Sequence, residues 1–256
     1  MSGFRVERWV WAGTSAAATY SLQCDVFDIT MEPQGAAVKS TTRRYDATHR
    51  QAQAARSRAA VVEAAGDLFL SGGYAATTIA SIGARAGVSV ETIYKVFGGK
   101  PGLVRAVCDR ALAGVGPVPA EERSDELQRR EPDPRAIIRG WGALTAEVAP
   151  RIAPVLLLVR DAAINDPAMA ELQTEMDLSR LTRMTRNAAA LADAGHLREG
   201  LDLESAADVL WTYSSPELFE LLVLRRGWPV GRYGTFVAEA MIAALLSDGD
   251  PERAAN

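Results

Sequence analysis

The chain has 256 residues, 48% of them apolar and 23% charged, with a net charge of −4 and two cysteines 84 positions apart. This is a soluble globular composition, and the cysteine usage argues against a disulfide framework or a zinc site and for a reducing cytoplasm. The apolar runs are too short for a transmembrane helix, so no membrane partner is expected. Charge is uneven, since residues 39–100 hold nine lysines and arginines against four acids, and residues 101–256 hold 17 against 24. Only the first of these two segments has the excess of positive charge that binding to a polyanion favours.

Residues 1–45 differ from the rest of the chain. The stretch FRVERWVWAGTSAAATYSLQC places two arginines before an apolar run, as a secretion leader does. Glycine, serine and threonine interrupt that run, and Gln23 before Cys24 is a poor cleavage context. We expect a disordered extension, or a start assigned upstream of a true start at Met31. A leader for export is kept as the alternative.

The next segment shows short helical patterns separated by glycine. An apolar face with i, i+3, i+4, i+7 spacing begins near residue 53 and ends at Gly72-Gly73. Thr77 or Thr78 can cap a second helix, and Gly87 can take the positive φ of a sharp corner. The apolar positions expected on the inner faces of these two helices are Val61, Val62, Ala65, Leu68, Phe69, Ile79, Ile82 and Ala86.

A third helix is predicted after this corner. Ser89 is a good N-cap, and Gly98-Gly99 breaks the helix before Lys100-Pro101 opens a fourth, where proline is tolerated in the first turn. The two helices flanking the corner are expected to share a small core. Its predicted members are Ile79, Ile82, Val88, Ile93 and Val96.

Beyond these helices, the segment GVGPVPAEERSDELQRREPDP (114–134) is rich in proline, glycine and charge, which predicts a linker. No segment alternates with period two, so an all-α protein is expected. Further helices are predicted at about 135–148, 151–164, 168–194, 203–225 and 230–247. The expected domains are an N-terminal extension (1–45), a domain of short helices (46–113) and a larger helical domain (114–256).

The paired short helices carry the functional signal. Two helices joined by a tight turn form a helix-turn-helix, whose second helix enters the DNA major groove. The segment TTIASIGARAGVSVETIYKVFGGKPGL resembles the N-terminal domain of the TetR family of bacterial one-component repressors. The specific motif covers residues 56–107, and the segment from Leu191 onward is similar to TetR C-terminal segments. Gly83 replaces the usual alanine, which we expect to be sterically harmless, and Val96 replaces the usual histidine or tyrosine.

The resemblance implies which residues meet DNA. Thr78 and Tyr94 match family residues that hydrogen-bond phosphate oxygens, and Lys100 adds its charge to a helix N-terminus. Base reading falls to the outward side chains of the third helix, and a basic arm precedes the first helix. The predicted DNA-binding residues are Thr78, Ser89, Val90, Glu91, Thr92, Tyr94, Lys95 and Lys100, with Arg43 and Arg44 in the arm.

Each assignment has a structural alternative. Thr78 and Ser89 can be helix caps only, Tyr94 a half-buried core residue and Lys95 a solvated charge. No catalytic motif occurs, so the chain is not expected to be an enzyme, and no cofactor or metal is expected.

The resemblance and the apolar pattern together predict a homodimer built on the last two helices, since one helix-turn-helix makes too few contacts for selective binding. The remaining helices are expected to enclose a small apolar or amphipathic effector. The predicted pocket residues are Trp141, Leu157, Met176, Trp211 and Phe219, for each of which ordinary core packing is the alternative.

The sequence therefore predicts a cytoplasmic, nucleoid-associated repressor that binds a palindromic operator as a dimer and is released by a small molecule. Two alternatives are a constitutive helical DNA-binding protein without an effector, and an interaction module that has lost operator binding.

Overall fold

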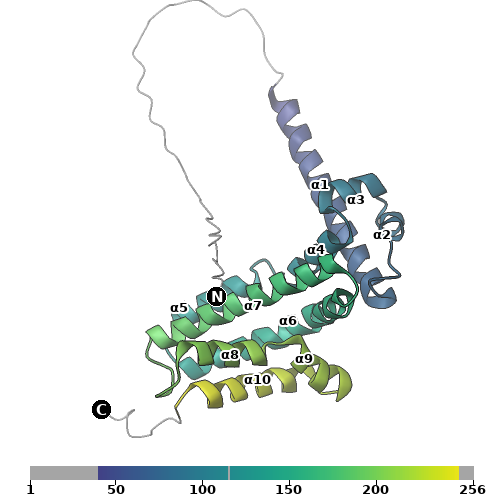
Figure 1. Cartoon of the computed structure of the whole chain (residues 1–256). Coiled ribbons are helices and arrows are strands. Elements are labelled where there is room, and N and C mark those ends of the chain that lie inside the picture. The colour runs from purple at the N-terminus through teal and green to yellow at the C-terminus, as the bar shows by residue number, and fades with distance from the viewer. Residues whose placement is uncertain (1–39, 115, 248–256) are drawn as a thin grey trace, which may run out of the picture. The chain divides into compact units, whose positions relative to one another are not determined.

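The computed structural model describes residues 40–114 and 116–247, with side chains from His49 onward. This part of the chain is helical and contains no strand, which confirms the predicted all-α class (Figure 1). The chain divides into two units, residues 1–45 and 46–256, and apart from residues 40–45 the features below belong to the second. The expectations for residues 1–39, including a start at Met31, lie outside the described residues.

Four helices make up the N-terminal part: α1 (Ser40–Gly72), α2 (Ile79–Ala86), α3 (Val90–Phe97) and α4 (Lys100–Ala113). Helix α1 begins well before the predicted residue 53 and stops at the predicted glycines, where Gly73 has φ +79°. Its predicted inner face is buried at Val61, Val62, Ala65 and Phe69, while Leu68 is partly buried.

The corner between α2 and α3 depends on two glycines. Gly87 ends α2 with φ +66°, a conformation that side chains with a Cβ rarely adopt. A Cβ at Gly83 would lie 2.7 Å from the carbonyl oxygen of Val88, so the backbone of the turn closes directly against α2. The replacement of alanine by Gly83 is therefore a requirement of this turn rather than a neutral change.

The predicted core of the corner is partly wrong. Ile82 and Ile93 are fully buried, but Val96 is 46% exposed. A helix turns by about 100° per residue, so the side chain of Val96, three residues after Ile93, points to one side of the buried face. The side chain of Phe97, four residues after Ile93, packs against the core.

The C-terminal part contains six α-helices and one π-helical segment: α5 (Ala120–Arg130), α6 (Pro134–Ala163), α7 (Pro167–Asp193), α8 (Leu203–Tyr213), α9 (Pro216–Phe219), η1 (Glu220–Arg225) and α10 (Val230–Leu245). The end of α4 coincides with the predicted domain boundary at residue 113, and the three-domain division stays a prediction.

Three boundaries differ from the sequence-based expectation. The predicted linker contains α5, because its Glu and Arg residues favour a helix once Pro119 and Pro134 are placed at the ends. Helix α6 continues through Pro150 and Pro154, since its packing against neighbouring helices offsets the lost backbone hydrogen bonds. The predicted helix 203–225 breaks at Ser215, which caps α9.

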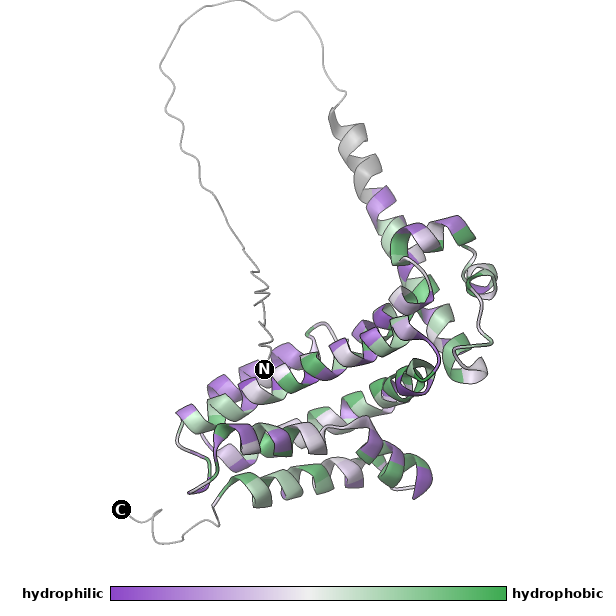
Figure 2. Cartoon of the chain, viewed as in Figure 1, coloured by the Kyte–Doolittle hydropathy of each residue, from purple (hydrophilic) through white to green (hydrophobic). Residues whose placement is uncertain are grey.

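Helix α6 is the central helix of this part, because it packs against α4, α5, α7, α9 and α10. Gly142 of α6 and Gly234 of α10 face each other so closely that a Cβ on either would lie 2.6 or 2.7 Å from the other's carbonyl oxygen. By length and composition α6 could cross a membrane, a property that core helices share. Figure 2 shows the apolar colouring that α6 shares with α10.

Candidate nucleic-acid interface

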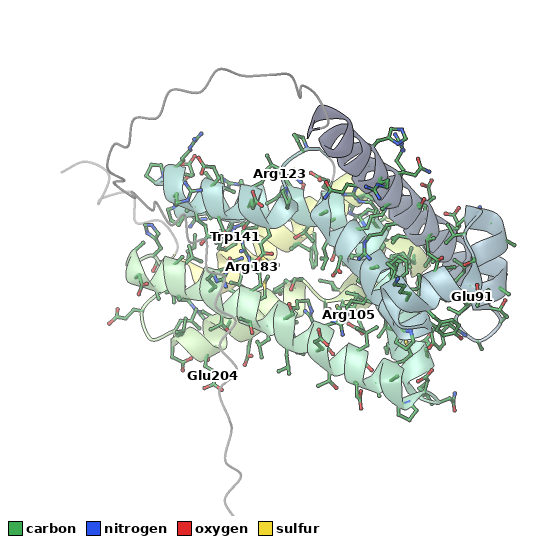
Figure 3. All side chains as sticks on the ribbon, turned by 90° about the horizontal axis from the view of Figure 1, so that it is seen from above. Glu91, Arg105, Arg123, Trp141, Arg183 and Glu204 are labelled. Carbon is green, nitrogen blue, oxygen red and sulfur yellow. The ribbon has the colours of Figure 1, made fainter. Side chains whose placement is uncertain are left out.

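Helix α3 presents a polar outer face on a buried anchor. Ile93 is fully buried, whereas Glu91, Thr92 and Lys95 are exposed and Tyr94 is 53% exposed. Figure 3 shows Glu91 at the outer edge of the N-terminal helices. Hydrogen bonds from its own backbone N–H and from the Ser89 side chain lower the pKa of Glu91, so this carboxylate is charged at neutral pH.

Val90 differs from its neighbours on α3. It is only partly exposed and packs against the core that Ile93 anchors. The structure therefore places this predicted base-reading residue beside the outer face, while Val96 is the more exposed apolar side chain of the helix.

Thr78 and Ser89 both act as helix caps. The hydroxyl of Thr78 accepts a 3.0 Å hydrogen bond from the Ser81 N–H, completing a capping box. The hydroxyl of Ser89 accepts a 3.3 Å bond from the Thr92 N–H. Both caps are exposed. The structure confirms that both residues are helix caps. It does not test whether they also contact DNA, so the predicted phosphate contacts stay predictions.

Lys100 is the first residue of α4, a helix whose N-terminus has no side-chain cap. Its ammonium nitrogen lies 4.1 Å from the centre of the Tyr74 ring, a cation–π contact that holds the side chain in place. The positive end of the α4 dipole and the lysine charge thus lie together, as required for holding a phosphate.

Tyr74 connects the DNA-binding helices to α7. Its hydroxyl donates a 2.9 Å hydrogen bond to Asp166, whose other carboxylate oxygen caps α7 through the N–H of Ala168. Burial and the Asp166 carboxylate raise the pKa of Tyr74. A second connection joins α4 to α7, where the Arg105 guanidinium binds both carboxylate oxygens of Glu175. No sequence motif marks Tyr74 or Arg105, because their partners lie about 70 or more residues away.

The arm arginines Arg43 and Arg44 lie in the first turns of α1, and their side chains are outside the described residues. Further along α1, Arg58 lies 4.8 Å from the centre of the Phe97 ring at the end of α3. This contact keeps one positive charge of α1 beside the recognition helix.

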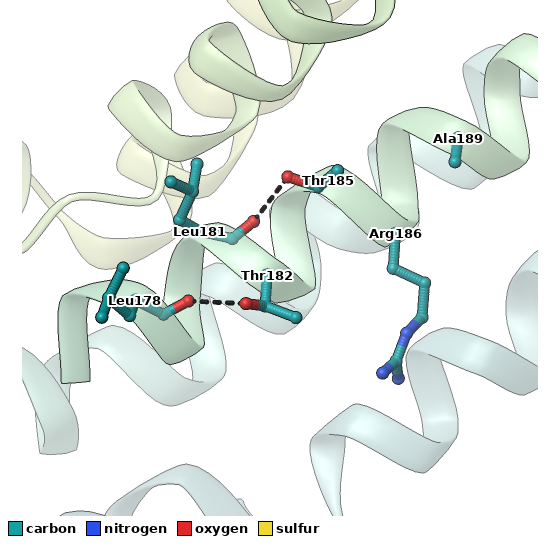
Figure 4. A pocket seen from close by; sticks show the side chains of 6 residues that line it. All are labelled: Leu178, Leu181, Thr182, Thr185, Arg186 and Ala189. Atoms are coloured by element: carbon teal, nitrogen blue, oxygen red, sulfur yellow. Dashed lines mark hydrogen bonds between the residues drawn. The ribbon is translucent and has the colours of Figure 1, made fainter. Parts of the chain in front are cut away.

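The five predicted pocket residues stay a prediction, and the structure shows how far each of them is buried. Trp141, Leu157 and Phe219 are buried, and Met176 and Trp211 are partly buried. Two surface hollows contain none of them. One follows the outer face of α7 at Leu178, Leu181, Thr182, Thr185, Arg186 and Ala189 (Figure 4), and the other lies between α4 and the start of α7. The described residues also contain no cluster of metal-ligating side chains.

An exposed recognition helix on a helix-turn-helix, followed by a larger helical region, defines the chain as a DNA-binding transcriptional regulator. Residues 61–107 match the family model for "Bacterial regulatory proteins, tetR family", so this segment belongs to the TetR family and the predicted resemblance is confirmed. The chain is accordingly a regulator and not an enzyme. No curated protein matches the sequence.

Three of the solved structures that share the fold are described here by their similarity to this chain. SmeT, the repressor of the Stenotrophomonas maltophilia multidrug efflux pump SmeDEF, is 25% identical in its complex with triclosan, with a TM-score of 0.58 over 75% of this chain and 93% of SmeT. NalD, the secondary repressor of the MexAB-OprM pump in Pseudomonas aeruginosa, is 18% identical, with a TM-score of 0.56 over 77% of this chain and 100% of NalD. The fatty acid degradation regulator FadR from Bacillus halodurans is 14% identical, with a TM-score of 0.60 over 73% of this chain and 94% of FadR. NalD and FadR indicate the fold alone.

Proposed function

We propose that this protein is a cytoplasmic repressor that binds a palindromic operator as a homodimer and leaves it when a small apolar or amphipathic effector binds. The observation that carries the proposal is the outer face of α3, where exposed Glu91, Thr92, Tyr94 and Lys95 surround a fully buried Ile93. A rigid helix with a polar outer face is what reading of the major groove requires.

The contacts with DNA divide into two kinds. Thr78, Tyr94 and Lys100 hold phosphates, which sets the position of the protein on the duplex without reading sequence. On α3, Lys95 pairs with guanine and Glu91 accepts from cytosine, each discriminating by about 1–3 kcal/mol. Ser89, Val90 and Thr92 at the start of α3, together with Arg43 and Arg44 of the arm, complete the proposed interface.

The homodimer uses the apolar surface of η1 and α10. Leu221 and Leu224 of η1 are 51% and 54% exposed, and Phe236 of α10 is 39% exposed. Phe236 also meets Trp228 edge-to-face, with ring centres 5.5 Å apart, and this keeps the aromatic side chains ordered at the surface. Large apolar side chains on neighbouring elements favour burial against a second copy.

In this proposal, α7 links effector binding to the release of DNA. SmeT, which shares 25% identity with this chain, forms a complex with triclosan, and we extend small-molecule binding to the helices that contain Trp141, Leu157, Met176, Trp211 and Phe219. An effector that binds better when α7 is displaced shifts the protein away from its DNA-binding conformer. Tyr74 and Arg105 transmit that displacement to α4.

Selection of bound duplexes from a random DNA library by the purified full chain tests the proposal. We expect a two-fold symmetric sequence, a protein dimer on it by native mass spectrometry, and loss of the complex with at least one small molecule. Failure to enrich any duplex at low ionic strength overturns the proposal. Enrichment that no compound reverses replaces it with a constitutive repressor.

A further inference from the structure

Helix α3 exposes an apolar side chain among its proposed base-reading residues. Val96 is 46% exposed, although it lies only three residues after the fully buried Ile93. Thr92 and Lys95, four residues and one residue before it, are exposed as well. Single apolar side chains are common on protein surfaces. This valine differs from them because its exposed neighbours are positioned to reach the edges of base pairs in a major groove.

The side chain of Thr92 lies on the same flank of α3 as Val96. Residues four positions apart differ by only about 40° around a helix axis, so their side chains are neighbours on its surface. The Thr92 hydroxyl is hydrogen-bonded to the hydroxyl of Ser89, with the two oxygens 3.0 Å apart. The methyl group of Thr92 therefore points away from Ser89. We call the surface of Thr92 and Val96 the methyl flank of α3.

The methyl flank is stiff and lies apart from the acidic side of the helix. Valine and threonine branch at Cβ, which restricts their side-chain rotation in a helix, so little conformational freedom is lost when they meet a partner. Glu91 lies about 140° from Val96 around the helix axis. The outer face of α3 thus presents charge on one side and preorganised methyl groups on the other.

The chemistry of base edges decides what such a flank can recognise. In the major groove, thymine is the base that presents a methyl group, whereas cytosine and adenine present an amino group and guanine presents acceptor atoms. An amino group covered by the methyl flank loses its water without gaining an acceptor, which is unfavourable. The flank consequently favours thymine in two ways, by burying its methyl group and by penalising the amino groups of other bases.

We propose that Val96 is a specificity-determining residue that contacts the 5-methyl group of one thymine in each operator half-site, with the methyl group of Thr92 completing the contact. This inference rests on the proposed function, in which the outer face of α3 reads the operator. Val90, the other valine of α3, packs partly against the core and is less available for this contact.

The test uses the duplex that the full chain enriches from the random library, resynthesised with deoxyuridine in place of one thymine at a time in both half-sites. Uracil pairs with adenine as thymine does and lacks only the methyl group. At one position, fluorescence anisotropy should show binding weakened by about fourfold per half-site, or about fifteenfold for the two, which is the effect of one buried methyl group in each.

Three variants assign the contact to a side chain. Val96→Ala should bind the thymine duplex severalfold more weakly than the wild type, and deoxyuridine should then cause no further loss. Val90→Ala is the matched control, because it makes the same change on the same helix and should keep the full difference between the two duplexes. Thr92→Val replaces the hydroxyl with a second methyl group at nearly the same volume, so the affinity for the thymine duplex should not fall.

The outcomes separate this inference from the proposed function. The inference is overturned if no thymine methyl group affects binding, or if the difference between the duplexes persists in Val96→Ala. Weaker binding by Thr92→Val would show that its hydroxyl is the contacting group and would overturn the methyl flank. An enriched duplex without dependence on thymine methyl groups leaves the repressor standing and removes only this inference, whereas failure to enrich any duplex overturns both.

Discussion

The hydroxyl of Tyr74 lies 2.9 Å from the carboxylate of Asp166, the residue that caps α7. Lys100, the first residue of α4, lies over the ring of the same tyrosine. One aromatic side chain thus contacts both the proposed phosphate-binding lysine and the first turn of a helix in the C-terminal part. We therefore expect a shift at the start of α7 to reach Lys100 through Tyr74.

Tyr74→Phe tests this connection. Loss of one partly buried hydrogen bond should lower the free energy of unfolding by about 1 kcal/mol and require more effector to release DNA, while operator affinity without effector stays within about twofold. Denaturant unfolding and fluorescence anisotropy give these quantities. The matched change Tyr94→Phe should do the reverse, weakening binding to every DNA sequence without altering stability. Identical effects of the two variants would contradict the assignment.

Lys95 and Lys100 should differ in how they affect DNA binding. Lys100→Ala removes a phosphate contact, so affinity should fall for all sequences and the slope of log affinity against log salt should decrease by about one. Lys95→Ala should lower discrimination at one base pair by about 1–3 kcal/mol. Anisotropy titrations with operator and scrambled duplexes at several salt concentrations distinguish the two. Equal losses on both duplexes for Lys95→Ala would remove it from base reading.

Gly83→Ala should destabilise the helix-turn-helix by about 1–3 kcal/mol, because the added Cβ meets the Val88 carbonyl at 2.7 Å. Gly66→Ala in α1 is the control, since its Cβ would make an ordinary 3.5 Å contact with Val107. That change should stabilise by about 0.5–1 kcal/mol through helix propensity. Thermal unfolding measures both, and a stable Gly83→Ala protein would show that the corner can open.

Leu221→Glu should prevent dimerisation, because it places a charge in the proposed apolar interface of η1 and α10. Sedimentation velocity should show a monomer, with operator affinity reduced at least tenfold. Leu178→Glu changes an equally large leucine, 59% exposed, on the outer face of α7 (Figure 4) and should leave the dimer intact. A dimer that survives Leu221→Glu but not Leu178→Glu would move the interface to α7.

Cys108 predicts a pH dependence of stability. Burial, with a further contribution from Asp109, raises the pKa of its thiol to about 12. In the unfolded chain the thiol ionises near pH 9, so its contribution is complete below pH 9 and is lost as pH rises towards 12. The free energy of unfolding should fall by up to about 1.4 kcal/mol per pH unit in this range.

Cys108→Ala isolates that effect. Removing the thiol changes packing at every pH equally, so the variant should be less stable at pH 7 but show a shallower decline from pH 9 to 10 than the wild type. Urea unfolding at each pH gives both slopes. Parallel declines would show that other groups dominate the alkaline loss.

The short N-terminal helices could be predicted because their signals are local. The Ser89 cap, the Gly87 corner and the buried Ile93 all follow from neighbouring residues, and the structure contains each of them. Val96 was misplaced because a valine three residues after the apolar Ile93 reads as core, although helical rotation carries it to the surface.

Features that depend on distant residues escaped prediction. The charge of α5 reads as a linker until Glu147 and Arg183 meet it from other helices, and Pro150 reads as a helix end until packing carries α6 through it.

The close contact of Gly142 with Gly234 makes one part of the protein stiffer than the rest. Two backbones in direct contact have no side chains between them that could rearrange, so α6 and α10 behave as one stiff frame, and α10 carries part of the surface proposed to join the two subunits. Any rearrangement on effector binding is then expected in helices outside this frame, such as α7. In each subunit the DNA-binding helices could then change conformation while the proposed dimer interface stays intact.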